Sequence, residues 1–417
     1  MSGLRAALAG LTTRGRCLLA AGLTLGLCAV LLGQRDLLRA AVFLVVLPLA
    51  AVALVARTRY RLACARSLEP ARVAAGSPAD VRLVLENVSR LPTGVLLMED
   101  VLPYALGGRP RFVLDRVEPQ GRRSVRYPVQ SDARGRFVVG PLSVRLTDPF
   151  GLVELVRRFA ETDELVVTPV VTPLPAVRLG GDWTGGGESS TRAVAASGTD
   201  DTATREYRHG DDLRRVHWKS TARVGELMVR REEQPFSSRA TLLLDGRAEA
   251  HRGDGPGSSY ERAVSAVASV GVALARAGFG LRLLDHAGHD LGPPGVPLTE
   301  AVLLDTLAAV TPERDAGLER AVGRLRSAGT DGALVAVLGR LSVDDAERLA
   351  RLRTGTGTCI AVLLDPGDVG ASGSPDDAVE SLLAGTGWRL LRVDHDTSLA
   401  RVWPLAAGRD APLPSVR

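Results

Sequence analysis

The sequence predicts a multidomain membrane protein made of a helical hairpin, a β-sandwich and a doubly wound α/β domain. Two long apolar runs stand near the amino terminus, with three residues between them. Next come short runs in which apolar and polar residues alternate, as is typical of strands with one buried face. In the last part of the chain, continuous apolar runs alternate with amphipathic segments, which indicates a mainly parallel sheet covered by helices on both faces.

The apolar runs cover residues 17–33 and 37–56, and we assign residues 1–61 to a transmembrane hairpin. The first run holds 17 residues and no charge. At about 1.5 Å per residue it reaches roughly 25 Å, which is enough to span a membrane. A cleaved signal peptide is the alternative for this run, but no small-residue cleavage site follows it and the second run begins at once. The short turn therefore forces two spans into a hairpin.

Arginine residues are concentrated at the outer ends of the two runs. Because basic residues favour the cytoplasmic side of a membrane, this placement predicts that both termini lie in the cytosol. The chain is then a multi-pass protein of the cell membrane, with residues 62–417 cytoplasmic. The outer arginines are Arg5, Arg14, Arg16, Arg57, Arg59, Arg61 and Arg66, whereas the turn region carries Arg35 and Arg39 beside Asp36.

Residues 62–173 are predicted to form an immunoglobulin-like β-sandwich. Runs such as DVRLVLENVS alternate apolar and polar residues, with Val81, Leu83 and Leu85 on one side of the strand. Strand signals recur every 10 to 15 residues or so, with Pro, Gly and Asn between them, and this is roughly the spacing of a small sandwich. No run with a helical period interrupts them.

Residues 174–204 are predicted to be a flexible linker, because Gly, Ser and Thr dominate and few side chains could be buried. The linker leads into a charged segment, residues 205–235, which begins with REYRHGDDLRRVHWKSTAR and continues into a predicted strand, ELMVRREEQ. Between residues 205 and 233, 14 of 29 side chains are charged, against 24% in the whole chain. This density is local, so it calls for a local explanation.

Catalysis is one interpretation of the charged segment. Carboxylates beside a histidine can hold a divalent ion or transfer protons, so a metal-dependent hydrolase using Glu206, Asp211 and His217 is an alternative function. Asp212 is a further carboxylate of the same kind. The nearby arginines and Lys219 would neutralise these carboxylates, however, and structural ion-pair networks resemble active sites in sequence.

Binding is the other interpretation of the charged segment. Its guanidinium groups suit phosphate or an acidic protein surface. Alternatively, the acids and bases satisfy one another while Tyr207 and Trp218 anchor the segment on a neighbouring protein. We favour this docking interpretation. The candidates for anion binding are Arg205, Arg214, Arg215, Lys219 and Arg223.

Residues 236–417 are predicted to form the α/β domain. A continuous apolar strand, ATLLLDG, opens it at residues 240–246, and a helix is expected at residues 343–353, opened by a capping box of Ser342 and Asp345. Sheets of this kind bind ligands at the carboxyl ends of their strands, where Asp245 and Asp365 are expected. Further strands are GLRLLD, GALVAVLG, CIAVLLD and WRLLRV, and further helices are expected at residues 258–277, 299–310 and 318–327.

Charge and cysteine content exclude other classes of function. The formal net charge is +5, but the first 66 residues contribute +8, so the remainder carries −3 and a nucleic-acid partner is not indicated. The four cysteines include no closely spaced pair and no histidine at ligand spacing, so neither a disulfide framework nor a zinc site is expected. We expect no cofactor. The cysteines are Cys17, Cys28, Cys64 and Cys359.

The charged segment closely resembles the signature of the bacterial family called domain of unknown function 58. A second stretch, RGRFVVGPLSVRLTDPFGL at residues 134–152, resembles the pattern that ends the β-rich part of such proteins. The resemblance implies two amino-terminal spans, a β-rich segment and a unit similar to a von Willebrand factor A domain. The matching signature residues are Arg205, Glu206, Tyr207, Gly210, Asp211, Asp212, Arg214, Trp218, Thr221, Ala222, Arg223, Val229 and Arg230.

The resemblance implies no established enzymatic activity. Its members commonly occur beside a MoxR-type AAA+ ATPase and membrane proteins with transglutaminase-like domains. This context implies a membrane-anchored accessory of an envelope-related or chaperone-like system. We therefore expect a non-catalytic adaptor that binds a protein partner, with the ATPase as the expected partner, through the signature residues from Arg205 to Arg230.

One position departs from the implied fold. A von Willebrand factor A domain that binds Mg²⁺ needs the pattern DxSxS after its first strand, so that an aspartate and two hydroxyls hold the ion. Here Asp245 is followed by Gly246, Arg247, Ala248 and Glu249, so both hydroxyls are missing and Arg247 would repel a cation. The sequence thus predicts a degenerate site without metal at Asp245.

Overall fold

The computed structural model describes most of the chain, which divides into two compact units. The first unit is Met1–Val170 with Leu307–Ala309, and the second is Val171–Thr306 with Val310–Arg417. The described residues are 10–57, 62–90, 92–148, 150–177, 179, 204–206, 221–223, 225–226, 228–230, 239–314, 317–328, 332–352, 357–364, 375–394 and 397–407.

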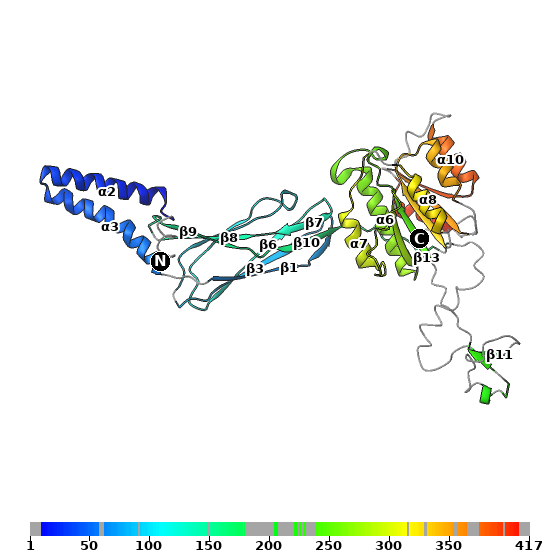
Figure 1. Ribbon diagram of the computed structural model, residues 1–417, viewed down its shortest axis with the longest axis horizontal. Helices are drawn as coiled ribbons and strands as arrows, with labels where there is room; N and C mark the ends of the chain where they lie inside the picture. Colours follow the sequence, from blue (N-terminus) through cyan, green and yellow to red (C-terminus); the bar gives the residue numbers. More distant parts are fainter. Residues whose placement is uncertain are drawn as a thin grey trace, which may run out of the picture. The chain divides into compact units, whose positions relative to one another are not determined.

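Two apolar helices, α2 (Thr13–Leu32) and α3 (Arg35–Arg57), open the first unit (Figure 1). Both are long and apolar enough to cross a membrane, which suggests membrane anchoring. They pack closely at Gly22, where an added Cβ would lie 2.7 Å from a methyl group of Val45. The predicted hairpin is therefore present as two packed apolar helices, while its orientation stays a prediction. Their exposed apolar side chains include Leu23, Leu27, Val30, Leu31, Val42, Phe43 and Val46.

Local signals define both ends of α2. The hydroxyl of Thr12 accepts a hydrogen bond from the Gly15 N–H at 3.3 Å, as an N-cap residue does. Gly33 ends the helix with a φ of +61°, a left-handed conformation that glycine adopts without strain. The chain can therefore reverse within two residues and begin α3 at Arg35.

A β domain (residues 62–170) makes up most of the first unit, and it has one hydrophobic core. The alternation predicted for β3 is confirmed, since Val81, Leu83 and Leu85 are fully buried. The sheets have the orders β1-β3-β6, β2-β10-β7 and β5-β4-β8-β9. This confirms a β-rich domain; the immunoglobulin-like assignment stays a prediction. The strands are β1 (Leu62–Glu69), β2 (Arg72–Ala74), β3 (Ala79–Asn87), β4 (Leu96–Asp100), β5 (Arg111–Leu114), β6 (Arg122–Val129), β7 (Gly135–Val139), β8 (Leu142–Thr147), β9 (Glu154–Phe159) and β10 (Asp163–Thr168).

A buried charge is satisfied inside the β domain. Asp100 accepts hydrogen bonds from Arg66 Nη2 at 2.8 Å and from the Tyr127 hydroxyl at 2.5 Å. Burial raises the pKa of Tyr127 well above its ordinary value, and the hydrogen bond to Asp100 raises it further. Burial also raises the pKa of the neighbouring Cys64 thiol to about 11. The cluster ties β1, β4 and β6 together, which is a structural role.

The second unit contains the α/β domain, whose five strands are all parallel in the order β14-β13-β15-β16-β17. As the continuous apolar runs predict, β15 is buried along its whole length. The direction of winding reverses between β13 and β15, because β14 lies on one side of β13 and all later strands lie on the other. Open sheets bind ligands at such a switch point. The strands are β13 (Arg239–Leu244), β14 (Gly280–Asp285), β15 (Ala333–Leu338), β16 (Thr358–Leu364) and β17 (Arg389–Val393).

Helices flank this sheet (Figure 1). Their starts agree with the sequence: the hydroxyl of Ser342 accepts a hydrogen bond from the Asp345 N–H at 3.1 Å and caps α9, as predicted. Thr172 donates its backbone N–H to Ser269 of α6 at 2.9 Å, so the chain joins the second unit slightly before the predicted linker begins. The helices are α6 (Ser259–Arg276), α7 (Glu300–Ala309), α8 (Glu319–Ala328), α9 (Val343–Ala350), α10 (Pro375–Gly385) and α11 (Leu399–Val402).

Candidate functional site

The candidate site lies at the carboxyl edge of the α/β sheet, at the switch point between β13 and β15. Asp245 directly follows β13 and is completely buried. Its backbone N–H donates to the carbonyl of Val337 at 3.0 Å, and its Oδ2 accepts the N–H of Gly339 at 3.1 Å. The sequence places Asp245 at this edge correctly.

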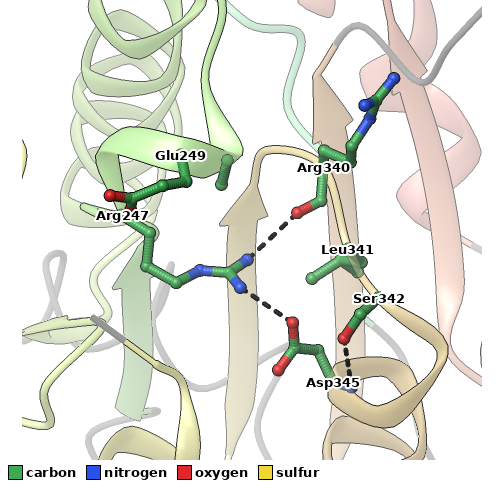
Figure 2. A pocket seen from close by; sticks show the side chains of 7 residues that line it. Arg247, Glu249, Arg340, Leu341, Ser342 and Asp345 are labelled. Atoms are coloured by element: carbon green, nitrogen blue, oxygen red, sulfur yellow. Dashed lines mark hydrogen bonds and ion pairs between the residues drawn. The ribbon is translucent and has the colours of Figure 1, made fainter. Parts of the chain in front are cut away.

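The guanidinium of Arg247 occupies the position that faces Asp245. Its Nε donates to Asp245 Oδ1 at 2.9 Å and its Nη2 to Asp245 Oδ2 at 2.8 Å, a bidentate ion pair. Its Nη1 donates to Asp345 Oδ2 at 2.8 Å, and Nη2 also reaches the carbonyl of Arg340 at 3.2 Å (Figure 2). One arginine therefore holds two carboxylates that come from different elements.

This ion pair is buried, and its surroundings favour the charged form of Arg247. The Arg247 side chain is only 10% exposed. Burial by itself lowers the pKa of Arg247, but the hydrogen bonds and negative charges of Asp245 and Asp345 outweigh it and raise the pKa above its ordinary value. Asp345 is also 3.5 Å from Arg348, so its second oxygen faces a positive charge as well. Both carboxylates therefore accept hydrogen bonds from the same guanidinium.

A tight turn positions Arg247. An added Cβ at Gly246 would lie 2.6 Å from His286 Nδ1, so the chain passes too close to this ring for any larger residue. The carbonyl of Gly246 accepts the Glu313 N–H at 2.7 Å, and the Ala248 N–H donates to the Glu313 carbonyl at 2.7 Å. The backbone of Glu313 thus holds the turn at Gly246 and Ala248, the residues before and after Arg247.

Two histidines border the site and were not predicted. His251 Nε2 lies 2.9 Å from the Asp245 carbonyl, and its Nδ1 lies 3.2 Å from the Ser259 hydroxyl. His286 is buried, and its Nε2 lies 3.4 Å from Glu313 Oε2. His286 directly follows β14, as Asp245 follows β13, so its position after a strand is the sequence feature that could have placed it at this edge. Nothing in the local sequence marks His251.

An open pocket of about 240 Å³ lies beside the ion pair (Figure 2). Arg247 and Asp345 point toward each other, whereas the side chain of Arg340 extends away from them and is exposed. Within the described part of the chain, the Arg340 guanidinium forms no ion pair. The pocket can therefore offer a free positive charge and hydrogen-bond donors to a ligand. It is lined by Arg247, Glu249, Ala250, Arg340, Leu341, Ser342 and Asp345.

Only part of the charged segment is described. Thr204–Glu206 forms β11 and Met228–Arg230 forms β12, and the two pair antiparallel with Arg205 opposite Val229. The strand predicted in ELMVRREEQ is confirmed by β12, and the structure brings both ends of the segment together. Arg223 is exposed in a helical turn with Thr221 and Ala222. The other predicted residues lie outside the described ones, namely Tyr207, Gly210, Asp211, Asp212, Arg214, Arg215, His217, Trp218, Lys219 and Asp365.

The catalytic interpretation gains no support from these residues. Of Glu206, Asp211 and His217, only Glu206 is described, as part of β11. Among the described residues, no group of three or more His, Cys, Asp or Glu side chains could hold a metal ion.

Residues 203–373 match the family described as "Protein of unknown function DUF58", which supports the family resemblance. No protein of curated function matches the chain. Among solved structures, a CARDB domain from Pyrococcus furiosus in complex with di-metal ions is 11% identical, covering 26% of this chain and 93% of its own, with a TM-score of 0.20. The complex of zinc 2-glycoprotein and prolactin inducible protein from human seminal plasma is 11% identical, covering 26% and 98%, with a TM-score of 0.21. TM-scores this low carry no argument about function.

Proposed function

We propose that this chain is a membrane-anchored, non-catalytic adaptor whose α/β domain binds a protein partner at the carboxyl edge of its sheet. The observation that carries this proposal is the Arg247 guanidinium, which neutralises both carboxylates at the switch point. In open α/β sheets this edge is where ligands bind. Here the same edge presents a neutralised ion pair beside the exposed guanidinium of Arg340.

The occupied carboxylates argue against acid–base chemistry at this edge. A general base must be free to accept a proton, but Asp245 accepts hydrogen bonds from Arg247 N, Nε and Nη2 and from Gly339 N. Separating a buried ion pair by removing one partner costs about 3–5 kcal/mol, so a substrate would have to overcome a cost of that size. A binding surface needs no such rearrangement.

Arg340 defines the chemistry of the proposed partner. Its guanidinium is exposed at the pocket, and a guanidinium binds carboxylates through paired hydrogen bonds. We therefore propose an acidic side chain on the partner as the group that docks here. We propose that the signature residues from Arg205 to Arg230 also contact the partner.

The resemblance to domain of unknown function 58 makes a MoxR-type AAA+ ATPase our proposed partner, in an envelope-related or chaperone-like system. We place the adaptor in the cell membrane with its two domains in the cytosol, as the arginines around the two apolar runs favour. Because Asp245 follows the first strand of the sheet, we also propose a von Willebrand factor A-like domain with a degenerate ion site. The two carboxylates that would face an ion there face Arg247 instead.

Direct binding tests the proposal. The full chain in lipid nanodiscs is titrated with a purified MoxR-type ATPase, and Arg340→Glu is compared with Arg401→Glu, which reverses another exposed arginine of the same domain. Loss of an ion pair worth about 1.4 kcal/mol weakens binding tenfold, so we expect at least that loss for Arg340→Glu and little change for Arg401→Glu. Equal binding by both variants would exclude this pocket, and no binding by the unmodified chain would exclude the ATPase.

A further inference from the structure

The loop between β8 and β9, residues 148–153, is joined directly to the start of α2. The Thr12 N–H donates to the Leu152 carbonyl at 2.9 Å, and the Thr12 hydroxyl donates to the Gly151 carbonyl at 2.8 Å. The Glu154 N–H donates to the Gly10 carbonyl at 2.8 Å. The loop therefore lies immediately beside the point where the first apolar helix begins.

The contact between loop and helix is close and apolar. An added Cβ at Gly15 would lie only 2.5 Å from the Leu152 carbonyl oxygen, so the helix rests on the loop backbone. Leu152 and Val153 are buried in one cluster with Ala51 and Val52 of α3. Both apolar helices thus contact the same loop.

The loop is also held internally. The buried carboxylate of Asp148 accepts the Phe150 N–H at 3.0 Å and the Val153 N–H at 2.6 Å. Gly151 has a φ of +68°, a conformation that favours glycine. These contacts fix the backbone at Phe150 and on its carboxyl-terminal side.

Phe150 is 62% exposed, although Leu152 and Val153 beside it are buried. One arginine lies close to this point: an added Cβ at Gly151 would lie 3.8 Å from Arg14 Nη1, and Arg14 is exposed, as is Arg16 in the same turn of α2. Basic residues are common where a membrane span meets water, and phenylalanine is among the apolar residues with which interfacial segments enter the boundary between headgroups and acyl chains. The same pattern occurs here on a loop that is distant from the helices in sequence.

We propose that Phe150 inserts its ring at the boundary between the headgroups and acyl chains of the membrane that α2 and α3 cross. This inference rests on the membrane anchoring in the proposed function. A lipid surface fits better than a protein partner because the loop that carries the ring packs against both helices, whose exposed side chains are apolar, and because Arg14 beside the loop suits anionic headgroups. The loop then gives the β domain its own contact with the bilayer.

Photocrosslinking tests this contact. The photoreactive phenylalanine analogue p-benzoylphenylalanine replaces Phe150 in the full chain, which is placed in nanodiscs of phosphatidylcholine and phosphatidylglycerol and irradiated. Mass spectrometry then measures the fraction of chain that carries a lipid. Phe43, which is 64% exposed on α3, is the positive control.

Tyr104, which is 99% exposed, is the matched negative control. In the antiparallel pairing of β4 with β8, Asp100 lies opposite Leu142 and Leu96 opposite Leu146. Tyr104 follows the Asp100 end of β4, whereas the loop follows the Thr147 end of β8. At about 3.3 Å per residue, the length of β8 separates the two positions by roughly 17 Å.

We expect lipid adducts at positions 43 and 150 and at least fivefold less adduct at position 104. Adduct at position 43 alone would overturn the role of Phe150 while leaving the membrane anchor in place. Equal adduct at positions 104 and 150 would show that exposure alone explains the labelling, and would overturn it as well. Absence of adduct at all three positions would refute the membrane anchor and this inference together.

Discussion

Replacing Arg247 by alanine tests the central ion pair most directly. The substitution removes a guanidinium that contacts both Asp245 and Asp345, and the Arg247 side chain is just 10% exposed. Breaking a buried ion pair by removing one partner typically costs about 3–5 kcal/mol, because an uncompensated charge stays behind. Domains are stable by about 5–15 kcal/mol, so the loss is a large share of the total.

Arg348→Ala is the matched control. Arg348 also contacts Asp345, at 3.5 Å, but its side chain is 39% exposed, and exposed pairs are worth about 0–1 kcal/mol. Urea unfolding followed by tryptophan fluorescence is a suitable assay, since Trp388 and Trp403 are buried in the α/β domain. The reasoning fails if Arg247→Ala destabilises the domain no more than Arg348→Ala.

A divalent cation should partly replace the missing guanidinium. In Arg247→Ala, two carboxylates face the space that the guanidinium occupied, 2.8 Å from each. A ligand that binds only the folded state at 100 times its Kd stabilises it by about 2.7 kcal/mol. Millimolar Mg²⁺ or Ca²⁺ is therefore expected to raise the unfolding midpoint of the variant and to leave that of the unmodified chain unchanged. Equal responses would mean that Arg247 does not occupy a cation position.

Three further predictions concern the first unit. Gly15→Ala should cost about 1–3 kcal/mol in the contact between α2 and the β8–β9 loop, because the added Cβ would overpack a backbone carbonyl. Gly26→Ala in the same helix is the control, since its Cβ meets only an ordinary 3.6 Å contact. Limited proteolysis of the loop compares the two variants, and equal cleavage rates would contradict the packing argument. Cys64, with its pKa raised to about 11, should be alkylated by iodoacetamide roughly 100-fold more slowly at pH 8.5 in the folded chain than in urea. Peptide mass spectrometry follows the reaction. A folded-state rate within threefold of the rate in urea would contradict the burial of this thiol. Tyr127→Phe should cost about 1–3 kcal/mol by leaving Asp100 short of a donor. The raised pKa of Tyr127 means that the folded state keeps its proton, so stability from this group is present below about pH 10, the unfolded pKa, and falls as pH rises above it. The variant should lack this alkaline loss, and an unchanged pH profile of urea unfolding would count against the assignment.

The candidate site was predictable in position but not in composition. Asp245 was expected at the carboxyl edge because an aspartate that ends a buried apolar strand must lie there in a parallel sheet. The sequence also predicts that a cation is disfavoured there, because the two hydroxyls after Asp245 are missing and because Arg247 would repel the ion. The second carboxylate, Asp345, was not predictable as part of this site, because it lies 98 residues after Arg247 in the sequence. Its local sequence already gives it another role, as the third residue after the N-cap Ser342.

The role of the stretch ending in DPFGL was likewise invisible in the sequence. The pattern is recognisable in the sequence, but the residue that binds its Gly151 and Leu152 carbonyls is Thr12, about 140 residues earlier. The register that brings Leu11 opposite Val153 depends on the packing of Leu152 and Val153 against α3, and no local pattern encodes that contact.

What the sequence determined by itself was local: the two apolar helices, the alternation that buries Val81, Leu83 and Leu85, the continuous strands of the parallel sheet and the cap at Ser342. Each of these follows from the periodicity of neighbouring side chains or from a hydrogen bond within a few residues. The tertiary structure decided which distant groups meet, namely Arg247 with Asp345 and Thr12 with the β8–β9 loop. Such contacts depend on how whole elements pack, and packing depends on the shape of every buried side chain at once.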